Sequence, residues 1–202
     1  MHTHLRAYRV ALSCKGGLLI AEVDDKATKL LVFVDETSAY VGQSREYGWA
    51  SSGERVYDVR PKGKKERVSL IAVTSLDASI AEQALVITDT VNKNAFLSFL
   101  ETTLLPTLAK GSVIVLDNWT VHHGEEVTEL VETHGCELLY LPTYSPDLNS
   151  IEHLFAKIKA FVKGLRPERI GDLIQAFCAA VKSVTSENAF NAFQHCGYKV
   201  EQ

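Results

Sequence analysis

A chain of 202 residues with 46% hydrophobic and 23% charged residues has the length and balance of one folded domain. These totals exclude disordered and fibrous proteins, and no apolar run is long enough to span a bilayer. The N-terminal residues lack the apolar core and cleavage site of a signal peptide, so we expect a cytoplasmic protein with no membrane partner.

The charge pattern gives opposing indications about nucleic acid. A formal net charge of −4 argues mildly against binding, because contact with phosphates favours basic proteins. Residues 60–67 are nevertheless strongly basic, and a second basic run lies between residues 157 and 169. A charge run is usually a solvated face, and for each run alone that interpretation has about even odds.

The first half of the chain is dominated by strand patterns. Residues 5–25 are ambiguous, and we expect a helix followed by a short turn. Residues 30–34 form a continuous apolar run that ends at Asp35, typical of a strand buried on both faces. Four further strand segments are expected at 48–50, 55–59, 68–75 and 83–88. Turn-forming residues separate them, as in an antiparallel meander.

The second half alternates helices and strands. A helix is expected at 94–109, followed by a buried strand at 113–116 that ends at Asp117. The remaining elements are expected as a helix at 125–133, a strand at 137–141 and helices at 151–165, 168–184 and 186–195. A helix between two strands usually makes a right-handed parallel crossover. If the strand ending at Asp117 neighbours the strand ending at Asp35, the two carboxylates emerge side by side.

Two aspartates on adjacent strands and a glutamate on a nearby helix suit phosphodiester cleavage. Two divalent ions about 4 Å apart can activate the nucleophile and stabilise the leaving oxygen. Magnesium prefers carboxylate oxygens. Glu152 would share a stripe of its helix with Lys159 and Lys163, which would place the two lysines near phosphates bound at the site.

The same residues have purely structural interpretations. Asp35 and Asp117, each taken alone, are turn residues in roughly two cases of three. Glu152 follows Asn149 by three residues, which resembles a helix capping box. Three other residues are expected in structural roles: His122 at the surface, Asn118 as a cap or turn residue and Trp49 as a core or edge anchor.

Three motifs together resemble DDE superfamily transposases. They are Phe33-Val-Asp35-Glu36-Thr37 followed by Gly48-Trp49-Ala50 and Gly53; Leu116-Asp117-Asn118 with His122; and Leu141-Pro-Thr-Tyr-Ser145-Pro146-Asp147-Leu-Asn149-Ser150-Ile151-Glu152. The 34 residues between Asp117 and Glu152 are typical of bacterial insertion-sequence transposases related to mariner elements. The closing His195–Tyr198 also resembles the ends of such proteins, and the similarity runs from about residue 29 to the C-terminus.

The resemblance implies an α/β, ribonuclease H-like fold with a mixed five-stranded sheet flanked by helices. The catalytic domain would be 29–202, preceded by an extension of uncertain structure at 1–28. It implies cleavage of DNA at transposon ends and strand transfer into target DNA, with two Mg²⁺ or Mn²⁺ ions held by Asp35, Asp117 and Glu152. Further residues are expected to orient these ligands (Asn118, His122, Asp147 and Asn149) or to contact DNA (Lys62, Lys64, Lys65, Lys159 and Lys163).

The chain also departs from the family pattern. Ser150 stands where a proline is common, and residues 1–28 are too short for the usual helix-turn-helix modules. We therefore expect a separately encoded catalytic half, a truncated copy or an excised piece. The expected partners are a helix-turn-helix DNA-binding protein and a second copy of the chain.

Two other functions stay open. The chain could be another ribonuclease H-like nuclease, acting on branched DNA or RNA–DNA hybrid, or a non-catalytic DNA-binding remnant. If the acids cluster tightly, Asp117→Ala should also raise the stability of the metal-free protein by relieving their repulsion.

Overall fold

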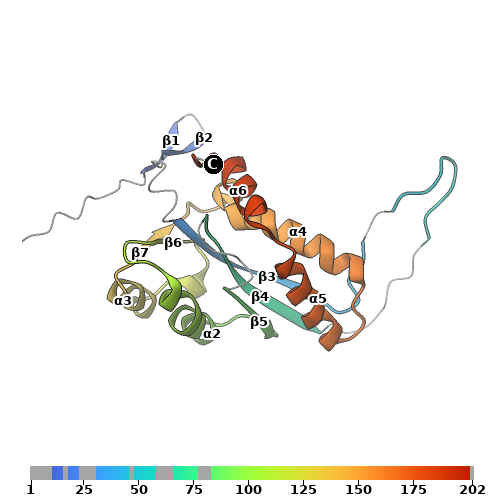
Figure 1. Cartoon of the computed structure of the whole chain (residues 1–202), viewed down its shortest axis with the longest axis horizontal. Coiled ribbons are helices and arrows are strands. Elements are labelled where there is room, and N and C mark those ends of the chain that lie inside the picture. Colours follow the sequence, from blue (N-terminus) through green and yellow to red (C-terminus); the bar gives the residue numbers. More distant parts are fainter. Residues whose placement is uncertain are drawn as a thin grey trace, which may run out of the picture.

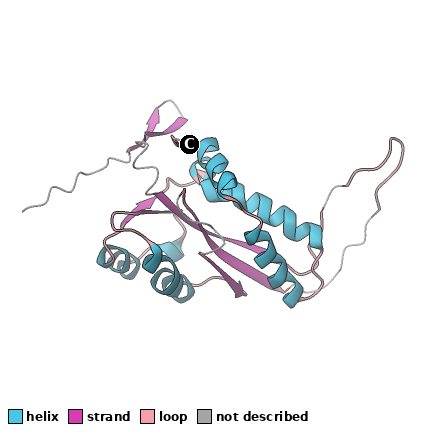
Figure 2. Cartoon of the chain, viewed as in Figure 1, coloured by secondary structure: helices cyan, strands magenta, loops and turns pink. Residues whose placement is uncertain are grey.

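A mixed five-stranded sheet forms the centre of the molecule (Figures 1 and 2). The computed structural model describes residues 11–15, 18–22, 31–45, 48–57, 66–76 and 83–200. The strands of this sheet are β3 (Leu31–Tyr40), β4 (Arg67–Thr74), β5 (Ala84–Thr88), β6 (Val113–Leu116) and β7 (Glu137–Tyr140). Their order is β5-β4-β3-β6-β7. The β3–β4–β5 part is an antiparallel meander, whereas β6 and β7 run parallel to β3, as expected.

Helices cover both faces of the sheet (Figure 1). One face carries α2 (Lys93–Phe99), extended by a π turn and a 3₁₀ turn to Thr107, and α3 (Glu125–Thr133). The other face carries α4 (Ser150–Leu165), α5 (Ile170–Lys182) and α6 (Ser186–His195). No helix in the described part of the chain has the length and hydropathy required to cross a membrane.

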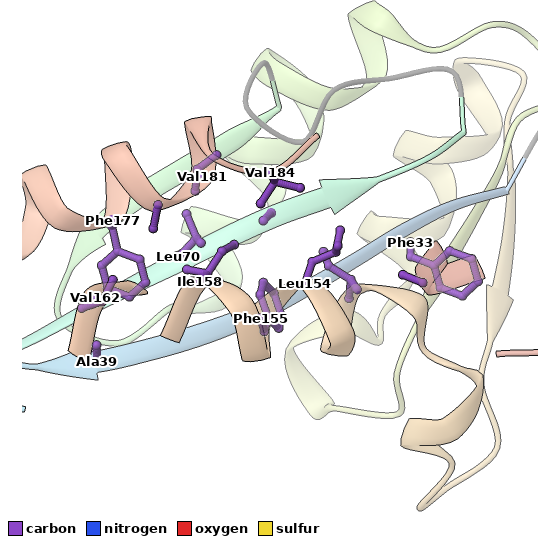
Figure 3. Close-up of a cluster of buried hydrophobic side chains, with 14 of the residues drawn as sticks. Phe33, Ala39, Leu70, Leu154, Phe155, Ile158, Val162, Phe177, Val181 and Val184 are labelled. Atoms are coloured by element: carbon purple, nitrogen blue, oxygen red, sulfur yellow. The ribbon is translucent and has the colours of Figure 1, made fainter. Parts of the chain in front are cut away.

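Alternate residues of β3 feed two hydrophobic clusters, one on each face of the sheet. Phe33 points to the cluster under α4, α5 and α6, and Val34 to the cluster under α2 and α3. In Figure 3, residues of α4 and α5 such as Ile158 and Phe177 pack over Leu70 of β4. Because β3 is buried from both sides, its backbone is a rigid base for any side chain that it carries at its edge.

The parallel pairing of β3 is much shorter than the strand itself. β6 pairs only with Leu31–Phe33, whereas β4 pairs with β3 from Phe33 to Tyr40. Asp35 was expected to end its strand; β3 instead continues for five residues beyond it. Asp35 therefore lies where β6 stops, and Asp117 is the first residue after β6.

Three expectations about local structure are wrong. Residues 5–25 contain no helix in their described part; β1 (Ala11–Lys15) and β2 (Leu18–Glu22) form a separate antiparallel pair. Residues 48–57 contain no strand and project away from the sheet as the teal loop of Figure 1, while 58–59 lie outside the described residues. Trp49, expected as an anchor, is fully exposed at the surface of this loop.

Candidate active site

Asp35 is a buried carboxylate held by two hydrogen bonds. Its side chain is 7% exposed and shares a face of β3 with the core residue Phe33. The backbone N–H of Glu36 donates to Oδ1 at 2.6 Å, and Asn149 Nδ2 donates to Oδ2 at 2.8 Å. Burial raises the pKa of Asp35 to about 7, and the negative charges of Glu36, Asp117 and Glu152 add to the rise.

Asp117 lines the same pockets as Asp35, but its pKa is shifted in the opposite direction. Its Oδ1 accepts from the backbone N–H of Trp119 at 2.9 Å and lies 2.7 Å from His122 Nδ1. Partial burial would raise the pKa of this carboxyl, but the bonds from His122 and Trp119 outweigh it and lower the pKa. The two aspartates therefore differ, since the pKa of Asp35 is raised and the pKa of Asp117 is lowered.

A buried histidine joins two carboxylates, one on β3 and one directly after β6. His122, expected at the surface, is fully buried, and its Nε2 lies 3.1 Å from both carboxylate oxygens of Glu36. Phe96 and Trp119 contact its ring. Burial alone would lower the pKa of His122, but hydrogen bonds to Asp117 and Glu36 raise it to about 10. The imidazolium thus links Glu36 to Asp117 as a charged hydrogen-bonded chain.

The third carboxylate comes from the first turn of α4. Glu152 is exposed, and its negative charge contributes to the raised pKa of Asp35. Asn149 precedes this helix, but its side chain makes no capping bond and is used for Asp35 instead. The capping-box interpretation of Asn149 and Glu152 is therefore wrong. The preceding turn is fixed by Tyr198, whose hydroxyl donates to the Leu148 carbonyl at 2.8 Å.

Two adjoining pockets meet at the carboxylates. Asp35, Asp117, Trp119 and Glu152 line both of them. The first, of about 350 Å³, extends past Thr37 toward Arg67 and Lys159. The second, of about 450 Å³, extends past Asn118 and the loop at 141–146. Together they form a groove with acids in its middle and basic groups at one end.

The carboxylates of the groove are suitable ligands for divalent ions, but they are not already arranged around a common point. Within the described residues, no three His, Cys, Asp or Glu side chains are already arranged around one point as a metal cluster. Asp35 and Asp117 are instead engaged by Asn149 and His122. The neighbouring negative charges repel the ionised form of Asp35 and so raise its pKa. A hard divalent cation bound among these carboxylates would relieve that repulsion.

The comparisons with known proteins agree on one family. Residues 30–174 match the family model described as DDE superfamily endonuclease. This chain belongs to the DDE superfamily endonucleases. It is 29% identical over 102 residues to the Tcb1 transposase of Caenorhabditis briggsae, a match that covers 48% of this chain and 37% of that transposase.

Solved structures establish the fold of this DDE endonuclease. A Mos1 mariner paired end complex with Mn matches with a TM-score of 0.66 and 18% identity, over 83% of this chain and 52% of the Mos1 chain. The Mos1 catalytic domain alone matches with a TM-score of 0.50 and 16% identity, over 86% and 85%. The expected ribonuclease H-like fold is thus confirmed.

The expected site residues of this DDE endonuclease fall into three groups. Asp35, Asp117, Glu152, Asn118, Asn149 and Lys159 line the groove, and His122 lies behind Asp117. Asn118 caps no helix; it lies in the bend after β6, and its amide donates to the Leu141 carbonyl at 2.6 Å. Two residues line neither pocket: Lys163, in the last turn of α4, and Asp147, whose charge acts on His153 and Cys196. Lys62, Lys64 and Lys65 lie outside the described residues.

Sequence reasoning gave no role to Glu36 or Arg67. Glu36 appeared only as a member of the first motif. The alternation of side chains along a strand predicts that Glu36 faces away from Asp35, toward α2 and α3. A carboxylate on that apolar face needs a partner, and this requirement was the available signal. The partner, His122, is 86 residues away, so spacing alone could not identify it.

Proposed function

We propose that this chain is the catalytic domain of a mariner-related transposase that cuts DNA at transposon ends and joins those ends to target DNA. The observation that carries the proposal is the meeting of Asp35, Asp117 and Glu152, from three separate elements, at one solvent-open groove. The similarity to the Tcb1 transposase and to Mos1 structures supports it.

Asp35, Asp117 and Glu152 would hold two divalent ions. Bound there, Mg²⁺ or Mn²⁺ would activate an attacking hydroxyl and stabilise the leaving oxygen. The Mos1 complexes described with Mn and with Mg support this choice of ions. The protein's own contribution is positioning: β3 fixes Asp35, Asn149 orients its carboxylate and His122 orients that of Asp117.

Finer features belong to the same proposal. The 34-residue spacing between Asp117 and Glu152 supports an origin in a bacterial insertion sequence, which would act at the nucleoid. Recognition of the transposon ends by a helix-turn-helix protein is part of the same proposal; the match covers 37% of the Tcb1 transposase. The Mos1 paired end complexes support a homodimer that brings two ends together. We place the catalytic domain at 29–202 and an extension at 1–28.

Magnesium-dependent nicking tests this function. Wild-type protein should nick a supercoiled plasmid in Mg²⁺ and not in EDTA. Asp117→Ala and the near-isosteric Asp117→Asn should both lower the nicking rate by at least about 100-fold, because each removes a ligand. Glu137→Gln, at the opposite end of β7 and exposed, is the matched control.

Substrate choice separates the alternatives. Faster cleavage of RNA–DNA hybrid or of a branched junction than of duplex transposon ends would replace the transposase assignment with another nuclease. Equal nicking by Asp117→Asn and wild type would remove the assignment of the carboxylates. Duplex binding with no nicking by any variant would leave a DNA-binding remnant.

A further inference from the structure

Glu36 is bonded to one aspartate of the groove by its backbone and is linked to the other through a histidine. Its backbone N–H donates to Asp35 Oδ1 at 2.6 Å. Its side chain points to the opposite face of β3, where both carboxylate oxygens lie 3.1 Å from His122 Nε2. The other ring nitrogen, Nδ1, lies 2.7 Å from Asp117 Oδ1. A single residue of β3 thus contacts the aspartate beside it and, through one ring, the aspartate after β6.

The ring nitrogens of His122 have no other partner in the described part of the chain. The ring is fully buried, and the centres of the Phe96 and Trp119 rings lie 4.6 and 5.6 Å from its own centre. Its two nitrogens meet only the carboxylate of Glu36 and the side chain and carbonyl of Asp117. A buried ring N–H without a hydrogen-bond acceptor is costly. The carboxylate of Glu36 therefore fixes the orientation of the ring that bonds to Asp117.

The bond from His122 selects one oxygen of Asp117. Oδ1 accepts from the backbone N–H of Trp119 at 2.9 Å and from His122 Nδ1. No hydrogen bond from a described residue reaches Oδ2, and the Asp117 side chain is 44% exposed. Asp117 follows the last residue of β6, so strand pairing does not fix its side chain. The two bonds to Oδ1 leave Oδ2 as the oxygen available to a cation in the groove.

We propose that Glu36 is a positioning residue: acting through His122, it holds the carboxylate of Asp117 so that Oδ2 is presented to a divalent ion. The proposal rests on the proposed function, because it takes Asp117 as a metal ligand. Residues that orient a metal ligand from behind affect metal affinity strongly, although they do not touch the ion. Glu36 is not itself a ligand, because its side chain is only 9% exposed and both its oxygens lie against His122.

Two conservative variants separate the reach of the Glu36 side chain from its charge. Glu36→Gln keeps the length of the side chain, and its amide still bonds to His122 Nε2 without a charge. Glu36→Asp keeps the charge but is shorter by a methylene group, so its carboxylate no longer reaches the ring. If Glu36 acts by positioning, glutamine should be the better substitute. If Glu36 binds the ion or acts through its charge alone, aspartate should be the better substitute.

Metal binding without DNA is the first measurement. The full chain is titrated with Mn²⁺, and free Mn²⁺ is followed by its electron paramagnetic resonance signal. The dissociation constant should rise by about 10-fold or more in Glu36→Asp and by no more than about 3-fold in Glu36→Gln. Asp117→Asn gives the effect of losing a ligand, and Glu137→Asp, at the exposed start of β7, is the matched control. Affinity in Glu36→Gln equal to or below that in Glu36→Asp would overturn the proposal.

A double-mutant cycle tests whether the effect passes through His122. In a His122→Gln background, Glu36→Asp should change Mn²⁺ affinity by less than about 2-fold, because the link to Asp117 is already broken. The full effect in that background would mean that Glu36 acts by another route, and the proposal would be wrong. Melting temperatures in EDTA identify any variant that is unfolded. If Glu36→Asp does not fold, Glu36→Gln decides alone, and a loss of affinity of about 10-fold in the folded variant would refute positioning.

Magnesium-dependent nicking separates this inference from the proposed function. Glu36→Asp should raise the Mg²⁺ concentration for half-maximal nicking by about 10-fold and change the maximal rate by less than about 3-fold. A lower maximal rate at an unchanged half-maximal concentration would contradict positioning. Wild type that nicks in Mg²⁺ keeps the proposed function whatever the order of the variants. Wild type that binds Mn²⁺ without nicking would remove the proposed function alone, and wild type that does neither would remove both.

Discussion

At the scale of single residues, the site places two neighbouring aspartates in opposite electrostatic states. Asp35 is buried among like charges, whereas Asp117 is paired with a buried imidazolium. Removing the negative charge should therefore have opposite effects on the stability of the metal-free protein at the two positions. The sequence could not predict this difference, because both residues follow apolar strand runs.

Asp35→Asn should stabilise the metal-free protein. Because the folded-state pKa of about 7 lies above the ordinary 3.8, wild-type stability should fall as pH rises from about 4 to 7 and stay low above that. The variant should lack this fall and gain up to about 4 kcal/mol at pH 8. Urea unfolding in EDTA from pH 4 to 8 measures the free energy of unfolding of both proteins. The same pH dependence in the wild type and the variant would contradict the prediction. Added Mg²⁺ should raise the melting temperature of wild type more than that of the variant.

Asp117→Ala should destabilise the metal-free protein, by about 1–3 kcal/mol at pH 7, because it leaves a buried imidazolium without one partner. This reverses the expectation from the sequence that Asp117→Ala stabilises the metal-free protein. The raised pKa of His122 stabilises the fold below about pH 6.5, and this contribution is lost as pH rises toward 10. Unfolding curves between pH 6 and 10 should therefore slope less in the variant, and an equal slope would argue against the His122 bond.

At the scale of elements, the start of α4 is placed by side chains rather than by a helix cap. Asn149 bonds to Asp35 of β3, and Tyr198, beyond α6, bonds to the Leu148 carbonyl. Phe33 of β3 in turn packs on both Tyr198 and Phe193. The distance between Glu152 and the aspartates is thus set by contacts from both ends of the domain.

Asn149→Asp separates these two roles. Aspartate is as good a helix cap as asparagine, so a capping residue would tolerate the change. Here it would put two carboxylates in contact, and we expect a loss of about 1–3 kcal/mol at pH 8 that shrinks toward pH 5, where a shared proton is available. Thermal melts at the two pH values measure it, and no loss at pH 8 would restore the capping interpretation.

Elements with a clear period were predicted well from the sequence. The bounds of β6 and α3 match the expected 113–116 and 125–133, because glycines and Asp117 end their apolar patterns. β3 was predicted too short, since Glu36–Ser38 are polar and only the tertiary fold reveals their partners. The three carboxylates were found because each lies at the end or start of such a pattern. Glu36 and Arg67 were missed because their positions depend on contacts between distant segments, whereas the resemblance pointed to Asn149 as a residue that orients a ligand, and Asn149 donates to Asp35.

At the scale of the molecule, the sheet and the helix layers on its two faces form a domain with a net negative charge, and the groove lies where β3 extends beyond β6. The net charge of −4 is compatible with DNA binding because Arg67 and Lys159 are gathered at one end of the groove. Both hydrophobic clusters are built from residues between Leu31 and Tyr198. The β1–β2 pair forms a sheet of its own.

A chain that begins at residue 29 should therefore fold like the full chain. We expect its melting temperature to lie within about 2 °C of the full-length value, since no residue of either cluster is removed. Differential scanning calorimetry of the two proteins checks it. A drop of 10 °C or more would place part of 1–28 inside the cooperative unit and would move the domain boundary.

The hydroxyl of Tyr198, bonded next to the segment that leads into α4, has a consequence for how such genes decay. A premature stop that removes only the last few codons would spare every acidic ligand and both basic groups of the groove. The shortened product would keep the groove, but the turn before the helix that bears Glu152 would have lost the hydrogen bond from Tyr198. Under the proposed function, such a shortened chain would keep all three carboxylates and yet cut DNA more slowly, so the presence of the three acids alone would not identify an active copy.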